Sequence, residues 1–212
     1  RTRFRPLPSG RVSVRAAKIF LAAELLTGAA ILFSFNWFAI ATGIASLAIV
    51  AVYPFMKRFT FWPQAVLGLA FAWGGLMGWA CAFGSLAWPA VLIYAAAIFW
   101  TIGYDTIYAM QDREDDALVG IKSSALRLSG NVRAGVAAFY ILTLLGWGMA
   151  IWSVRPEKQA LVALLPVAFH LGMQVASLKS DGSNALGQFR SNRVAGLLAA
   201  LAFLVVGAAG QY

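Results

Sequence analysis

The stretch "LAWPAVLIYAAAIFWTIGYDTIYAMQDREDD", residues 86–116, decides the fold. Between residues 86 and 108 only one side chain, Asp105, is charged. A membrane-spanning helix needs about 20 mostly apolar residues. The stretch lacks the two-residue alternation of a barrel strand, so its pattern favours a helix. It then ends in acids, because five of the eight Asp and Glu residues of the chain lie between residues 105 and 116.

Apolar stretches of similar length recur along the chain, which has 212 residues, 61% of them hydrophobic and 12% charged. Soluble domains carry about 25% charged residues, so most of this surface is expected to face lipid. The sequence predicts an all-α fold, a polytopic membrane helix bundle. Its seven transmembrane helices are expected at 16–35, 37–56, 62–83, 86–108, 134–153, 159–178 and 193–211.

The distribution of positive charge supports this count. If the N-terminus lies on the inner side, all but two of the 17 Lys and Arg residues fall in inner loops. The outer connections then hold only Arg155 and Lys158. Lys and Arg concentrate in the cytoplasmic loops of membrane proteins. The net charge of +9 therefore indicates topology and contact with membrane lipids, and no nucleic-acid partner is expected.

The acids at the end of the fourth predicted span and just after it have a helical spacing. On one continuous helix, Asp112 and Asp116 would each lie within about 20° of Asp105, and Tyr108 would lie on the same side. Carboxylates this close repel one another unless a cation lies between them. Hard oxygen ligands suit Mg²⁺ or Ca²⁺, and Mg²⁺ commonly combines a few carboxylates with substrate phosphates. The spacing therefore points to a metal-dependent site at the inner end of a helix.

Two other interpretations of the acids remain open. In the first, they belong to a solvated helix end and pair with Arg113, Lys122 and Arg127. In the second, they bind a cation or proton in a transporter, because acids at membrane depth often mark ion paths. A proton relay is expected to place acids deep in several spans, whereas Glu24 is the only other acid within a predicted span.

Longer motifs carry a resemblance. "YDTIYAMQDREDD" (104–116), followed by "GIKSSALRLSG" (120–130), resembles the second aspartate-rich motif of the UbiA superfamily of membrane prenyltransferases. Three further segments look like its 4-hydroxybenzoate polyprenyltransferase branch. They are "RTRFRPLPSGRVS" (1–13), "YPFMKRFTFWPQAVLGLAFAWGGLMGWA" (53–80) and "FRSNRVAGL" (189–197). The resemblance covers essentially the whole chain.

The resemblance also implies a departure from the family pattern. The family has nine transmembrane helices, and its first aspartate-rich motif comes just before the loop that here is residues 1–11. Residues 1–212 are therefore expected to form a single transmembrane prenyltransferase domain that is incomplete at its N-terminus, with seven of nine helices. This polypeptide alone is expected to be inactive.

The activity implied is Mg²⁺-dependent transfer of a polyprenyl group from polyprenyl diphosphate to the ring of 4-hydroxybenzoate, in ubiquinone biosynthesis. The enzyme would lie in a bacterial or mitochondrial inner membrane, with its active face on the cytoplasmic or matrix side. The nearest alternative is a relative that prenylates another acceptor, such as homogentisate or a naphthoate.

By resemblance, Asp112 and Asp116 hold a Mg²⁺ ion on the diphosphate, and Asp105 is a third ligand or a helper. Arg58 is assigned to catalysis and to anion binding, because a guanidinium fork fits a carboxylate or a phosphate. Tyr108 is assigned to catalysis, since an aromatic face stabilises an allylic cation. The other residues expected to bind substrate are Lys57, Lys122, Arg127 and Tyr53.

Two further sets of residues have less specific expected roles. His170, the single histidine, lies in mid-span and is interpreted as a packing or hydrogen-bonding residue. Arg190, Asn192 and Arg193 in "FRSNR" are expected on the inner side, either at the rim of the cavity or against lipid headgroups.

Overall fold

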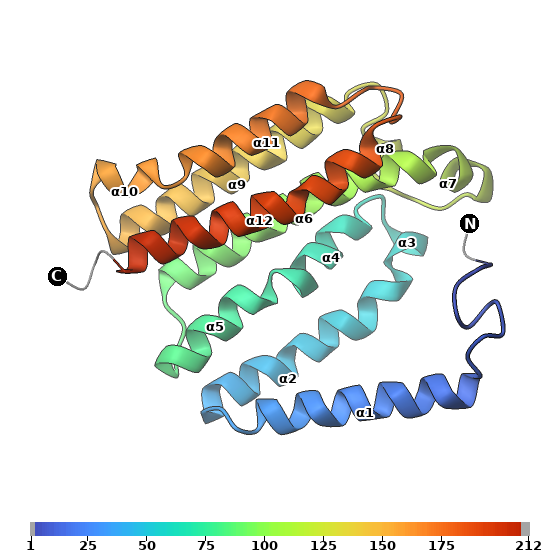
Figure 1. Ribbon diagram of the computed structural model, residues 1–212, viewed down its shortest axis with the longest axis horizontal. Helices are drawn as coiled ribbons and strands as arrows, with labels where there is room; N and C mark the ends of the chain where they lie inside the picture. The colour runs from blue at the N-terminus through green and yellow to red at the C-terminus, as the bar shows by residue number, and fades with distance from the viewer. Residues whose placement is uncertain (1–2, 209–212) are drawn as a thin grey trace.

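The computed structural model describes residues 3–208, apart from the side chain of Lys57. Every regular element in this range is helical (Figure 1). In chain order these are α1 (Val14–Leu32), α2 (Trp37–Val52), the 3₁₀ turn η1 (Tyr53–Phe55), α3 (Met56–Phe59), α4 (Pro63–Phe71), α5 (Trp73–Phe83), α6 (Trp88–Ala109), the 3₁₀ turn η2 (Met110–Asp112), α7 (Arg113–Val119), α8 (Ser124–Arg127), α9 (Val132–Val154), α10 (Lys158–Val162), α11 (Leu165–Ser177) and α12 (Ala185–Ala208).

Six helical segments of the described chain are long and apolar enough to cross a membrane. They are Trp37–Phe55, Pro63–Phe83, Trp88–Val119, Val132–Val154, Lys158–Ser177 and Ala185–Ala208. The first predicted span forms α1, whose 19 residues include Arg15, Lys18 and Glu24. The all-α polytopic membrane fold is thus confirmed, with six spans by this measure and α1 as a more polar seventh helix.

Several predicted spans are subdivided or shifted. The span 62–83 divides into α4 and α5, and the span 159–178 divides into α10 and α11. Pro166 stands in the first turn of α11, where a missing backbone N–H is tolerated. The last helix begins at Ala185 instead of residue 193, so the polar segment "QFRSNR" is helical too. Residues 209–211 of that predicted span lie outside the described residues.

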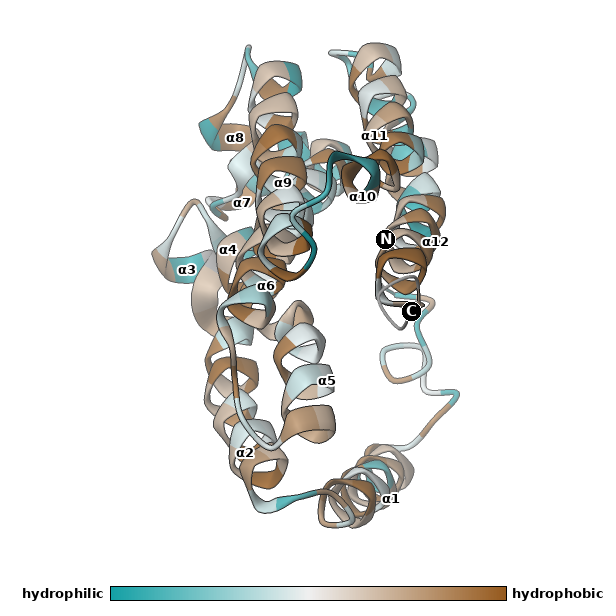
Figure 2. Ribbon diagram, turned by 90° about the vertical axis from the view of Figure 1, so that its left-hand side faces the viewer, coloured by the Kyte–Doolittle hydropathy of each residue, from teal (hydrophilic) through white to brown (hydrophobic). Residues whose placement is uncertain are grey.

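Helix α6 is the centre of the bundle and packs against α4, α5, α9 and α12. The approach of α9 depends on small residues: a Cβ added at Gly146 would meet the Ala96 Cβ at 2.7 Å. Small residues allow such close contact between membrane helices. In contrast, α1 lies at the edge of the molecule and none of its residues is buried (Figures 1 and 2).

Helices α3 and α8, which lie at the same end of the bundle in Figure 1, carry hydrophilic colouring in Figure 2. We call the end that carries α3, α7 and α8 the inner end, in keeping with the orientation predicted from loop charge. The candidate site lies at this end, where α6 passes into α7.

Candidate active site

The acidic stretch does not continue α6 as a regular α-helix. Helix α6 ends at Ala109, the three residues of η2 form a 3₁₀ turn, and α7 ends at Val119, followed by Gly120, whose φ is 74°. A 3₁₀ turn advances by about 120° per residue, against about 100° in an α-helix. The three residues of η2 thus rotate α7 by about 60° relative to α6. The acids therefore lie along a twisted line on the helix rather than a straight stripe.

The three candidate metal ligands consequently have different surroundings. Asp105 and Asp112 are half-buried, while Asp116 is buried, with 7% of its surface exposed. Asp105 and Asp112 are seven residues apart, about 10 Å along a helix axis, whereas Asp112 and Asp116 are separated by about one turn. Within the described part of the chain, no three acidic, His or Cys side chains gather closely enough to hold one metal ion.

The donor chemistry nevertheless suits a magnesium ion. Mg²⁺ is bound in proteins by one or two carboxylates, completed by waters and substrate phosphates. Asp112 and Asp116, two carboxylates one turn apart, correspond to that protein share. An ion held by this pair would take its remaining ligands from waters or phosphate oxygens, and Asp105 lies at a lower level on α6.

Below this pair, a cavity of about 480 Å³ opens between α4, α6 and α12. Its walls combine aromatic rings with one acid and two arginines. They are formed by Leu67, Phe71, Trp100, Tyr104, Asp105, Phe189, Arg190, Asn192 and Arg193. The cavity brings Asp105 together with the "FRSNR" residues, which lie 84 or more positions later in the sequence.

The aromatic wall of the cavity is continuous. The ring centroids of Trp100 and Tyr104 lie 5.5 Å apart, and those of Tyr104 and Phe189 lie 5.9 Å apart. Tyr108 extends the wall toward the inner end, 4.8 Å from Phe189. Tyr53 is half-buried, and both it and Tyr104 lie within electrostatic range of the Asp105 carboxylate. The predicted tyrosines thus lie on the same side of the bundle as Asp105.

A buried polar network supports α12 where it meets this cavity. Trp100 Nε1 donates a hydrogen bond to Asn192 Oδ1 at 2.9 Å, and Asn192 Nδ2 donates to Gln174 Oε1 at 3.2 Å. The hydroxyl of Tyr140 donates to the same Gln174 oxygen at 2.8 Å. Helices α6, α9, α11 and α12 are therefore joined through amide and hydroxyl groups.

His170 belongs to the edge of this network. Its Nε2 lies 3.1 Å from the carbonyl oxygen of Ser191 and 3.2 Å from Gln174 Nε2. The expected hydrogen-bonding role of this histidine is confirmed.

A second polar cluster fixes the segment after α7. The hydroxyls of Thr106 and Ser124 are 2.6 Å apart, and Gln64 Oε1 accepts a hydrogen bond from the Ser124 N–H at 3.4 Å. All three residues are buried. Sequence reasoning missed Gln64 and Thr106, since single polar residues inside apolar spans were the only signal. The cluster attaches the α7–α8 segment to α4 and α6.

The predicted cationic residues are distributed around the inner end. Lys122 Nζ donates to the Phe59 carbonyl at 3.2 Å and lies 5.4 Å from the ring centroid of Phe61. Arg58 on α3 and Arg127 at the end of α8 are exposed. The side chain of Lys57 lies outside the described residues. Lys122 therefore links the loop after α7 to the end of α3.

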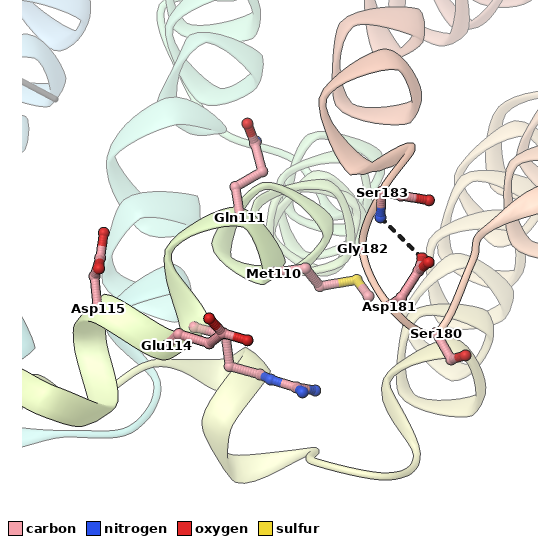
Figure 3. A pocket seen from close by; sticks show the side chains of 9 residues that line it. Met110, Gln111, Glu114, Asp115, Ser180, Asp181, Gly182 and Ser183 are labelled. Carbon is pink, nitrogen blue, oxygen red and sulfur yellow. Dashed lines mark hydrogen bonds between the residues drawn. The ribbon is translucent and has the colours of Figure 1, made fainter.

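The remaining acids of the window face another hollow. It holds about 430 Å³ at the inner surface, between the α6–α7 junction and the loop before α12 (Figure 3). Glu114 and Asp115 line it, and Asp181 lies on the side opposite Asp115 (Figure 3). A backbone hydrogen bond of 2.9 Å from the Ser183 N–H lowers the pKa of Asp181. Asp105, Asp112 and Asp116 do not line this hollow.

The fold and site define a polytopic helical membrane protein with an acidic inner end over an aromatic cavity. The model of the UbiA prenyltransferase family matches residues 1–204, and the chain belongs to that family. The fold is similar to that in the apo structure of a UbiA homolog from Aeropyrum pernix K1, with a TM-score of 0.73 at 22% identity. That likeness covers 96% of this chain and 77% of the other.

Curated relatives show which members of the family the sequence is similar to. The chain is 43% identical over 200 residues to the mitochondrial 4-hydroxybenzoate polyprenyltransferase of Drosophila melanogaster, covering 93% of this chain and 51% of that protein. The proteins of the same name from Rattus norvegicus and Arabidopsis thaliana are 39% and 40% identical over 201 and 195 residues. These matches cover 93% and 91% of this chain, and 54% and 48% of the relatives. The chain thus spans about half the length of the curated relatives it matches.

Proposed function

We propose that these residues belong to an aromatic prenyltransferase of ubiquinone biosynthesis. It would transfer a polyprenyl group from polyprenyl diphosphate to 4-hydroxybenzoate. The names of relatives at about 40% identity support this substrate pair. The structural observation that carries the proposal is the position of Asp112 and Asp116. They lie one turn apart on the helical segment whose preceding turns line an aromatic cavity.

The bonds, electrons and proton of the proposed reaction can all be accounted for. The allylic C–O bond of the diphosphate breaks, and its electron pair leaves with pyrophosphate. The allylic carbon bonds to the ring carbon next to the phenol, and that ring carbon then loses its proton. The energetic difficulty is the charge that develops on the leaving group.

Asp112 and Asp116 would supply carboxylate oxygens to a Mg²⁺ ion, with Asp105 as a third acid nearby. Bound there, Mg²⁺ would neutralise charge on the departing pyrophosphate. Arg58, Lys57, Lys122 and Arg127 are the inner-end cations proposed to bind substrate anions. Because Lys122 already donates to the Phe59 carbonyl, its proposed role includes ordering the loop over the substrate.

The cavity would serve the organic part of the reaction. The faces of Tyr108, Tyr104 and Trp100 can stabilise an allylic cation. The apolar surroundings keep water from the reacting carbon. We propose that the active face is the inner one, on the cytoplasmic or matrix side, and that the polyprenyl tail lies among membrane lipids.

The test uses membranes that carry the 212 residues together with any coding sequence that precedes Arg1 in the gene. Product from radiolabelled 4-hydroxybenzoate and a polyprenyl diphosphate is expected with Mg²⁺ and should disappear with a chelator. Asp112→Ala should lower the rate by about 100-fold or more, which corresponds to about 2.7 kcal/mol of transition-state stabilisation. Glu114→Ala is the matched control, because Glu114 is exposed and lines the other hollow.

Other activities predict different results. Prenylation of homogentisate or a naphthoate, but not of 4-hydroxybenzoate, would contradict the acceptor and keep the reaction class. Cation flux in reconstituted vesicles, without any prenylated product, would instead support transport.

A further inference from the structure

Two arginines on α12, Arg190 and Arg193, have no role in the proposed reaction. Both line the cavity of about 480 Å³, and both are exposed. They are three residues apart on a helix, a spacing that places side chains next to each other. The cavity therefore has a cationic edge in addition to its aromatic wall.

The rotation of α12 about its axis is fixed at this level. Asn192, between the two arginines, is 7% exposed. Its amide oxygen accepts from Trp100 Nε1 at 2.9 Å, and its amide nitrogen donates to Gln174 Oε1 at 3.2 Å. Turning Arg190 and Arg193 away from the cavity would break both buried hydrogen bonds. The arginines are thus held at the cavity edge by the scaffold.

The level of this cationic edge differs from that of the aspartate pair. The contacts of Asn192 with Trp100 and of Phe189 with Tyr104 place the edge beside residues 100–104 of α6. Tyr104 and Asp112 are eight residues apart, about 12 Å along a helix axis. A diphosphate bound at Asp112 and Asp116 would therefore leave the arginines available to a second anion.

The walls indicate the chemical class of that anion. Trp100, Tyr104 and Phe189 offer flat faces and edges to an aromatic ring. A guanidinium binds a carboxylate through two parallel hydrogen bonds. We propose that Arg190 and Arg193 bind the carboxylate of an aromatic acid acceptor whose ring packs against Trp100, Tyr104 and Phe189. This assignment rests on the proposed function and differs from the assignment of the carboxylate to Arg58.

The first experiment measures prenylation kinetics for wild type and for Arg193→Gln, Arg193→Lys and the double variant Arg190→Gln/Arg193→Gln. Arg193→Gln should raise KM for 4-hydroxybenzoate about tenfold or more, since a hydrogen bond to a charged group is lost. KM for the polyprenyl diphosphate should not change. Arg193→Lys should recover part of the loss. The matched control is Lys179→Gln, an exposed cation in the loop before α12.

A neutral analogue separates carboxylate recognition from general damage. Wild type should prefer 4-hydroxybenzoate to its methyl ester, and the double variant should lose this preference. Equal KM values for 4-hydroxybenzoate in wild type and double variant would overturn the proposal. The proposal would also be overturned if, in nanodiscs of varied lipid composition, the variants lost activity only in proportion to the content of anionic lipid. The arginines would then bind headgroups.

A binding measurement keeps this test independent of turnover. Trp100 lies in the cavity wall, so quenching of tryptophan fluorescence by 4-hydroxybenzoate should report occupancy. If wild type binds the acid but forms no product, the proposed reaction fails and the carboxylate subsite stands. If the double variant binds the acid as well as wild type does, the subsite fails.

Discussion

Single polar side chains carry much of the order in the apolar interior of this bundle. Asn192 connects Trp100 of α6 to Gln174 of α11, and Tyr140 of α9 joins them at the same Gln174 oxygen. In lipid, a polar group that loses its partner has no water to replace it. Each of these side chains therefore constrains helices that are distant in sequence.

Truncation of Tyr140 and truncation of Asn192 should lower the stability of the protein by different amounts. Tyr140→Phe removes one donor and leaves Gln174 Oε1 bonded to Asn192, so a loss near the average of about 0.6 kcal/mol for membrane hydrogen bonds is expected. Asn192→Ala leaves the Trp100 N–H and the Gln174 oxygen with fewer partners, and we expect about 1–3 kcal/mol. Unfolding midpoints in mild detergent measure both. A larger loss for Tyr140→Phe than for Asn192→Ala would contradict the central position of Asn192 in the network.

At the scale of elements, close packing of α6 and α9 positions the helix that carries the acids. Gly146 of α9 faces Ala96 of α6, and a Cβ at Gly146 would approach the Ala96 Cβ to 2.7 Å. Both groups are fixed to helix backbones, so relief requires the helices to separate. That movement would displace the α6–α7 junction.

Gly146→Ala should therefore destabilise the protein by about 1–3 kcal/mol, the usual cost of overpacking. Gly172→Ala on α11 is the matched control, because a Cβ there meets nothing within 4 Å. It should be neutral or stabilising, since alanine favours helix more than glycine does. The comparison uses thermal unfolding in detergent, and equal midpoints for the two variants would rule out the tight α6–α9 contact.

The whole molecule has a predicted orientation that depends on charge. The connections expected inside carry most of the Lys and Arg residues, and the α5–α6 connection near Ser85 carries none. This distribution places the acids of η2 and α7 on the same side as the basic loops. Orientation can be measured without any assay of activity.

Cysteine labelling tests the orientation in the membrane, in a Cys81→Ala background that removes the native thiol. Ser85→Cys and Ser180→Cys are both exposed positions in connections at opposite ends of the bundle. In bacterial cells that carry the protein in the inner membrane, an impermeant maleimide should label Ser85→Cys directly. Ser180→Cys should react only after permeabilisation. The reverse pattern would show that the acids lie on the outer side.

Prediction of the helices from the sequence was accurate where apolar residues dominated a long segment. Runs of about 20 apolar residues have no alternative to a spanning helix, so the fold class and the approximate spans can be predicted from composition. It was less accurate at element ends. The polar residues of "QFRSNR" suggested a loop before residue 193, whereas this segment is helical and Asn192 accepts a hydrogen bond from Trp100 within it.

The sequence by itself determined the membrane class of this protein, its inner clustering of charge and the identity of its acidic residues. These properties depend on transfer of side chains between water and lipid, which is local and additive along the chain. Only the tertiary structure decided that the acids twist across η2, that Asp105 faces the aromatic cavity, and that Arg190 and Arg193 join it there. These arrangements depend on contacts between α4, α6 and α12, whose residues are far apart in sequence and meet only when the helices pack.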